Sequence, residues 1–277
     1  MRPFALALTF ALLAALPAAA QTPRCDALAE PQRALAQELF KAVHPYDCCD
    51  ETLDACLKAE ERCRLAERLA DDVCRMVKAG KDRSFVERAL DKRAQSMIDL
   101  GARASFALDD AMSTGAPDAP VQLVVYACAR CPFCSVLLPQ LYREVTEGSL
   151  KGKVRLYFRP YPIKSHPGST EGALGLITAA RLGKFWPFLL ELYGNFDQFD
   201  CQKMVGWAKA VGMDPEAFDK ARQEPALREV LVESKKEGLR NKVAATPTLY
   251  VNGRLYSYEL DIEVLKDVLA EESEKQK

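Results

Sequence analysis

The sequence has little histidine and almost no excess charge. Only two of its 277 residues are histidine, His44 and His166, so its chemistry is sought first among other side chains. Lys and Arg number 38 and Asp and Glu number 39, a formal net charge of -1, which argues against a uniformly basic face and a nucleic-acid partner. Only residues 4–16 form a long apolar run, which excludes a multi-span membrane chain.

The sequence contains ten cysteines, and its first segment indicates the cellular compartment of the protein. Residues 1–20 carry one charge, an apolar run, Pro17 and three alanines, the pattern of a secretory signal peptide. The run is short for a membrane span, although an uncleaved anchor is the alternative interpretation. Cys25 follows Thr22-Pro23-Arg24 rather than a small apolar box, so no lipid anchor is expected. We therefore predict a periplasmic, exported protein whose compartment permits disulfides.

The remaining chain divides into two predicted domains with a linker between them. Residues 21–105 show apolar positions at helical spacing and predict a small cysteine-rich helical bundle. Residues 106–120 have the composition of a loop, rich in serine, glycine and proline, and are predicted to be the linker. Residues 121–277 are predicted to form the second domain.

The second domain alternates between strand and helix patterns. Strands are predicted at 121–126 and 154–158 with a helix from 132 between them, followed by broken helices over 169–242. Asn252-Gly253 then predicts a hairpin, and the last helix is expected over 261–272. This order predicts an α/β fold, thioredoxin-like, with an inserted helical subdomain.

A CxxC motif lies where the first strand of this domain gives way to its first helix. Pro132 suits the first turn of that helix, so Cys131 is expected at its N-terminus, where free backbone N–H groups and the helix dipole favour a thiolate. Cys134 shares a helix face with apolar residues and is expected to point inward. In this interpretation Cys131 attacks a substrate disulfide and Cys134 resolves the mixed disulfide. A fixed structural disulfide is the alternative.

The motif, with His166-Pro167, residues 183–186 (GKFW) and residues 246–253 (TPTLYVNG), resembles the DsbA-like family of thioredoxin-fold thiol disulfide oxidoreductases. The resemblance covers about residues 120–272. It implies that Cys131 is the nucleophile and Cys134 the resolving thiol. It also implies that Thr246 and a cis Pro247 line the active site together with Pro132 and Phe133.

Two departures from the family pattern bear on the direction of electron flow. The strong oxidants of the family have histidine inside the motif, whereas Phe133 cannot donate a hydrogen bond or charge to the Cys131 thiolate. A less oxidising potential is therefore expected. Threonine before the proline is more typical of the isomerase and reductase branches, so oxidase, isomerase and reductase all stay open.

Cys128 extends the motif to three cysteines spaced by three residues. Such a run is a possible zinc or iron–sulfur ligand set, but a helix from Pro132 would separate the sulfurs, and no metal is predicted. Cys128 is interpreted either as a buried thiol at the end of the strand or as a disulfide partner of Cys201.

The first domain holds an even number of cysteines, which in an exported chain favours a framework of up to three disulfides. The alternative is that Cys48-Cys49, or another pair, relays electrons to the CxxC motif. Parts of residues 49–86 also show a fainter resemblance to the three-helix thiol domain of cytochrome c maturation, but adjacent cysteines stand where that family has a CxxC. The sequence contains no CxxCH motif, so covalent haem attachment is not indicated. The six cysteines are Cys25, Cys48, Cys49, Cys56, Cys63 and Cys74.

The sequence thus predicts an exported thiol disulfide oxidoreductase that exchanges disulfides with protein cysteines through Cys131 and Cys134. Its expected partners are protein or peptide thiols and a redox partner protein, either bound to the membrane or outside it, and no cofactor is expected. The competing hypothesis is a non-catalytic, cysteine-rich scaffold or metal-binding chaperone with a thioredoxin-like domain. His166 is expected to be a loop residue, and the aromatic side chains between 185 and 193 are expected in the core.

Overall fold

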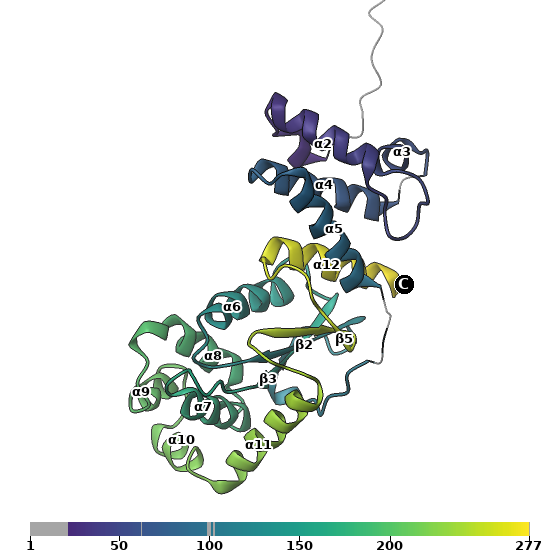
Figure 1. Ribbon diagram of the computed structural model, residues 1–277. Coiled ribbons are helices and arrows are strands. Elements are labelled where there is room, and N and C mark those ends of the chain that lie inside the picture. The colour runs from purple at the N-terminus through teal and green to yellow at the C-terminus, as the bar shows by residue number, and fades with distance from the viewer. Residues whose placement is uncertain (1–21, 62, 99–100, 102, 277) are drawn as a thin grey trace, which may run out of the picture. The chain divides into compact units, whose positions relative to one another are not determined.

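The computed structural model describes residues 22–61, 63–98, 101 and 103–276 (Figure 1). The predicted signal segment, residues 1–20, lies outside the described residues. Within the described ranges, no helix is long and apolar enough to cross a membrane. The chain forms two compact units that divide between Arg88 and Ala89.

The N-terminal unit is helical. Its elements are α1 (Pro23–Asp26), α2 (Glu30–Ala42), α3 (Leu53–Lys58) and α4 (Arg64–Lys78), followed by the first residues of α5 (Arg83–Met97). The apolar positions of α4, which recur at helical spacing, are all buried: Leu65, Leu69, Val73, Met76 and Val77. Its core includes Leu39, Leu53, Leu65, Leu69, Val73, Cys74 and Val77, all nearly inaccessible to solvent.

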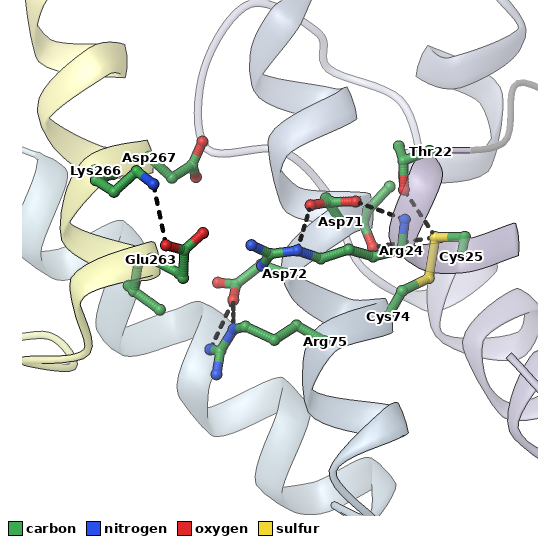
Figure 2. Close-up of polar contacts among 12 residues, drawn as sticks. Thr22, Arg24, Cys25, Asp71, Asp72, Cys74, Arg75, Glu263, Lys266 and Asp267 are labelled. Atoms are coloured by element: carbon green, nitrogen blue, oxygen red, sulfur yellow. Dashed lines mark hydrogen bonds and ion pairs between the residues drawn. A yellow bond between two sulfur atoms is a disulfide. The ribbon is translucent and has the colours of Figure 1, made fainter. Parts of the chain in front are cut away.

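Three disulfides join the six cysteines of this unit: Cys25–Cys74, Cys48–Cys63 and Cys49–Cys56. Figure 2 shows the first of them where α1 meets α4. Beside it, Arg24 Nε lies 3.1 Å from a carboxylate oxygen of Asp71, which adds an ion pair between the same two helices. A small bundle has little core to stabilise it, and covalent links of this kind compensate.

The second unit is built on a five-stranded sheet in the order β1-β3-β2-β4-β5. The central strands β2 (Val121–Ala127) and β3 (Val154–Pro160) are parallel, because α6 (Pro132–Thr146) carries the chain back between them. The edges are antiparallel. They are formed by β1 (Ser113–Thr114) on one side and, on the other, by the hairpin of β4 (Thr248–Val251) and β5 (Arg254–Leu255).

Helices cover both faces of this sheet (Figure 1). Helix α6 packs against α12 (Ile262–Lys275), which follows the hairpin. Between β3 and β4 the chain forms the predicted helical insertion. Its elements are α7 (Ser169–Arg181), α8 (Phe185–Gly194), η2 (Phe196–Gln198), α9 (Lys203–Ala210), α10 (Pro215–Ala221) and α11 (Pro225–Arg240). The mixed sheet with this insertion and the disulfide-linked helices confirms the predicted fold class.

The aromatic residues expected in the core are there, with Phe185, Trp186, Phe188 and Tyr193 all buried. The stretch interpreted as a linker takes more structure than its composition suggested. It contains a 3-10 turn, η1 (Asp110–Met112), and the edge strand β1, which pairs with β3. Two residues are too few to show strand periodicity in a sequence. The domain limits inferred from composition stay a prediction.

Candidate active site

The site is built where β2 ends and α6 begins. Cys131 is the N-cap residue of α6, with an extended backbone (φ -93°, ψ 122°), and Pro132 follows in the first turn. Proline fits here because the first helical N–H has no partner inside the helix and the ring fixes a helical φ. The Cys131 sulfur therefore lies beside the free N–H groups and the positive end of the helix dipole.

The Cys131 thiol lies within reach of several hydrogen-bond partners. A hydrogen bond from the Cys134 side chain is the largest influence, and it lowers the pKa of Cys131 to about 5 although burial acts to raise it. The Thr246 side chain and the backbone N–H groups of Cys134 and Phe133 lower this pKa further. At neutral pH the group is a thiolate, which is the nucleophilic form of cysteine.

Cys134 has the opposite environment. Its side chain is inaccessible to solvent, on the helix face that also buries Leu137, Leu138, Leu141 and Val145, as the spacing predicted. Burial, followed by the hydrogen bond to Cys131, raises the pKa of Cys134 far above its ordinary value. Phe133, between the two cysteines, is 72% exposed. The pair thus combines a thiolate with a protonated neighbour.

The turn before β4 contributes the other side of the site. Strand β4 pairs with β2 in a register that sets Tyr126 opposite Thr248, so the start of β4 lies next to the end of β2. The peptide bond between Thr246 and Pro247 is cis, as the family resemblance implied. The Cys131 sulfur lies 3.2 Å from the Thr246 carbonyl oxygen, to which it donates a hydrogen bond when the thiol is protonated. Residues 115 positions apart in sequence are joined in this way.

Cys128 lies directly behind the motif. It is buried and not disulfide-bonded, and burial raises the pKa of its thiol. Its sulfur is 3.5 Å from His166 Nδ1, and its carbonyl accepts a hydrogen bond from the Tyr193 hydroxyl at 3.2 Å. The sequence placed His166 in a loop but gave no sign of this contact, which spans 38 residues.

Arg130 is a second residue of the site that the sequence analysis missed. Its guanidinium stacks on the rings of Phe196 and Phe199, 4.4 and 4.5 Å from the ring centroids, and donates to the Phe196 carbonyl. These contacts fix the turn that carries Cys131 against the inserted helices. No local pattern marks such a contact, because its partners lie in the insertion.

The accessory cysteines take separate positions. Cys201 is a free, partly buried thiol in the turn before α9, and it forms no disulfide with Cys128. Cys48 and Cys49 are bonded to Cys63 and Cys56 and not to each other. Among the described residues, no group of three or more His, Cys, Asp or Glu side chains is arranged to hold a metal ion.

Comparison with known proteins agrees with this geometry. A family model described as thioredoxin matches residues 108–271, more than half of the chain. The chain therefore belongs to the thioredoxin family.

Curated relatives match about half of the chain. A probable disulfide bond formation protein D of Bacillus cereus is 29% identical over 168 residues, which are 56% of this chain and 76% of that protein. The Na(+)/H(+) antiporter NhaA 1 of Mycolicibacterium gilvum is 31% identical over 144 residues, 50% of this chain. The chain spans only 23% of the antiporter's length.

Solved structures show the same fold. BdbD from Bacillus subtilis has a TM-score of 0.53 at 21% identity, over 63% of this chain and 100% of BdbD. The catalytic domain of ScsC from Proteus mirabilis has a TM-score of 0.52 at 17% identity, over 68% of this chain and 98% of that domain.

Proposed function

We propose that this chain is an exported thiol disulfide oxidoreductase that exchanges disulfides with protein cysteines through Cys131 and Cys134. The observation that carries the proposal is the placement of the Cys131 sulfur at the N-terminus of α6, with its pKa lowered to about 5 beside a buried, protonated Cys134. The family membership supports it.

The chemistry is an exchange of sulfur–sulfur bonds. A client thiolate attacks Cys131 in the Cys131–Cys134 disulfide, a mixed disulfide forms at Cys131, and Cys134 leaves and takes up a proton. The second client thiol then attacks the client sulfur of the mixed disulfide and releases Cys131 as its stable thiolate. The client is oxidised and the pair reduced by two electrons. Run in reverse, the same steps reduce a client, with Cys134 as the resolving thiol.

The pKa of Cys131 suggests an intermediate oxidising power. A stable thiolate favours the reduced pair and so makes the disulfide more oxidising. A value of about 5 lies between the values of about 3.5 and about 7 found for strongly oxidising and for reducing CxxC proteins. This agrees with the weaker oxidant expected from Phe133.

Client binding is proposed beside the pair. Phe133 and Val136 are 72% and 62% exposed on the first turns of α6, an apolar surface next to the reactive sulfur. Exposed aromatic and aliphatic side chains suit contact with an extended or unfolded peptide. Thr246 and Pro247 form the other border of the site. A redox partner protein, in the membrane or outside it, is proposed to restore the pair.

Export and a division of labour between domains are part of the proposal. The signal-like residues 1–20 and the three disulfides of the N-terminal unit both suit an oxidising compartment. A structure of similar fold is described as a periplasmic thioredoxin-like protein from Salmonella enterica, with a TM-score of 0.50. We assign the chemistry to residues 121–277, with 21–105 as a disulfide-linked domain and 106–120 as the linker. Cell fractionation and N-terminal sequencing, with Gln21 as the expected first residue, test the export.

The exchange is tested by oxidation of a reduced peptide dithiol in glutathione buffer. The wild type is expected to accelerate oxidation, and Cys131→Ala is expected to abolish the acceleration. Cys201→Ala is the matched control, because it removes a free thiol outside the motif, and it should retain wild-type rates. A scaffold without catalytic function would give no acceleration in any of the three proteins.

A further inference from the structure

The proposed exchange uses two thiols, yet a third, Cys128, is built into the same site. It immediately follows β2 and lies three residues before Cys131, as Cys134 lies three residues after it. Its side chain is inaccessible to solvent and is not disulfide-bonded. Cys131 therefore has a thiol at the same sequence distance on either side.

The backbone brings Cys128 and Cys131 close together. The Cys131 N–H donates to the Cys128 carbonyl at 3.1 Å, which closes a four-residue turn. Such a turn holds its first and fourth Cα atoms within about 7 Å. Disulfides join Cα atoms that are usually about 4.4–6.8 Å apart. The turn thus keeps the two cysteines near the range that a disulfide requires.

Cys128 also has the chemical setting of a resolving thiol. Like Cys134, it is buried and held protonated while Cys131 is a thiolate. In addition, His166 Nδ1 lies 3.5 Å from its sulfur and can accept the thiol proton in the tautomer that carries the ring hydrogen on Nε2. The Arg130 N–H lies 3.4 Å from the same sulfur and would stabilise the thiolate left behind.

We propose that Cys128 is a second resolving thiol, which clears mixed disulfides from Cys131 when Cys134 does not. The inference rests on the proposed function. The Cys128 proton passes to His166 Nδ1, and the Cys128 thiolate attacks the Cys131 sulfur. A Cys128–Cys131 bond forms as the bond between Cys131 and the bound thiol breaks, and the departing thiolate takes up a proton. One disulfide replaces another, so no external oxidant or reductant is needed.

The test follows a defined adduct on Cys131 after Cys134 has been removed. All proteins carry Cys201→Ala, so that the remaining free thiols are those of the site. The reduced Cys134→Ala and Cys128→Ala/Cys134→Ala proteins are mixed with glutathione disulfide, desalted, and followed by intact-mass measurement and peptide mapping. Cys128→Ser/Cys134→Ala is made in parallel, in case the alanine at 128 prevents folding.

In Cys134→Ala, the glutathione adduct on Cys131 is expected to decay into a Cys128–Cys131 disulfide at least about 100-fold faster than it disappears from the proteins without Cys128. His166→Gln in the Cys134→Ala protein is expected to slow this decay by about 100-fold, the usual effect of removing a positioned base. An adduct that persists equally with and without Cys128 overturns the inference and leaves the proposed function standing. Absence of any adduct on Cys131 in the Cys128→Ala/Cys134→Ala protein, where no second thiol of the site can remove it, overturns the proposed function itself.

Discussion

Cys131 differs from the other unpaired thiols of the described chain in the direction of its pKa shift. Burial raises the pKa of Cys128, Cys134 and Cys201. At Cys131, hydrogen bonding from Cys134, Thr246 and the first N–H groups of α6 outweighs the same burial. One free thiol of the described chain is therefore ionised in preference to the others at neutral pH, and it is the one at the helix N-terminus.

The first prediction is the pH dependence of Cys131 alkylation in the reduced protein. Because its pKa is lowered to about 5, the thiolate is fully formed at pH 7 and is lost as the pH falls through about 5. The rate of carboxamidomethylation at Cys131, followed by mass spectrometry, should reach half its plateau near pH 5. Half-maximal reaction near pH 8.5, the value of an ordinary thiol, would contradict the account.

The second prediction concerns the Thr246 hydroxyl. Its oxygen is buried, and a hydrogen bond from this hydroxyl to the Cys131 sulfur lowers the pKa of Cys131. Thr246→Val removes the hydroxyl and keeps the shape, so the pKa of Cys131 should rise by about one unit or more, since a hydrogen bond to a charged group contributes about 1.5–3 kcal/mol. The same alkylation profile measures it.

The matched control is Thr248→Val. The Thr248 hydroxyl donates instead to the Ala245 carbonyl at 2.8 Å, so its loss should leave the Cys131 profile in place. Equal shifts in both variants would show that the effect comes from disturbance of the turn and not from the Thr246 hydroxyl.

For individual residues, the sequence predicted the features that a local pattern determines. The helix start at Pro132 and the apolar spacing behind it were enough to assign the helix N-terminus to Cys131 and a buried position to Cys134. An exposed Cys131 sulfur was expected, but Cys131 is only 1% exposed, because the turn before β4 lies against it. His166 and Arg130 were out of reach for the same physical reason. Their contacts bridge 38 and 66 residues and depend on how the inserted helices pack.

Among the helices and strands, the boundaries marked by glycine, asparagine and proline were the easiest to predict. Gly183, Asn195 and Pro225, residue types that often end or begin helices, each lie at an interruption of the predicted helical stretch 169–242. The edge strand β1 and the short helices α1 and α3 were not predicted. A two-residue strand and helices of four and six residues show no periodicity, and they form because of the disulfides and strands beside them.

The third prediction concerns α5 and α12, where Arg93 is buried. Its Nη2 lies 2.6 Å from Asp267 and 3.0 Å from Glu271 on α12. Arg93→Leu leaves two carboxylates without this partner, and we expect the free energy of unfolding to fall by about 3 kcal/mol, as measured by denaturant titration. Arg88→Leu, at an exposed position of the same helix, should cost less than about 0.5 kcal/mol. Equal losses would show that the ion pair contributes nothing specific.

The fourth prediction compares two disulfides of the N-terminal unit. Cys25–Cys74 spans a sequence separation of 49 and Cys49–Cys56 one of 7. Closing a longer loop removes more entropy from the unfolded chain. Replacing both cysteines by serine should therefore lower the free energy of unfolding by about 4 kcal/mol for Cys25–Cys74 and by about 2 kcal/mol for Cys49–Cys56. Denaturant unfolding of both variants measures these two losses of stability. A larger loss on removing Cys49–Cys56 than on removing Cys25–Cys74 would contradict the prediction.

For the whole molecule, the ten cysteines divide by chemistry. Six are joined in disulfides that hold the N-terminal unit together, and three of the four free thiols lie within one turn and one helix start in the second unit. The sequence predicted this division from cysteine count and spacing. It did not determine which of the possible disulfide pairings forms, because pairing depends on how the helices pack.

The most direct test of the account is the equilibrium reduction potential of the Cys131 and Cys134 pair, measured against glutathione with every other cysteine tracked by mass spectrometry. We predict a value between about -120 and about -270 mV, the range between a strong disulfide donor and a reductase. The six cysteines of the N-terminal unit should stay paired over that range. A Cys131–Cys134 disulfide that resists reduction well below about -300 mV would be structural, and it would contradict the catalytic role.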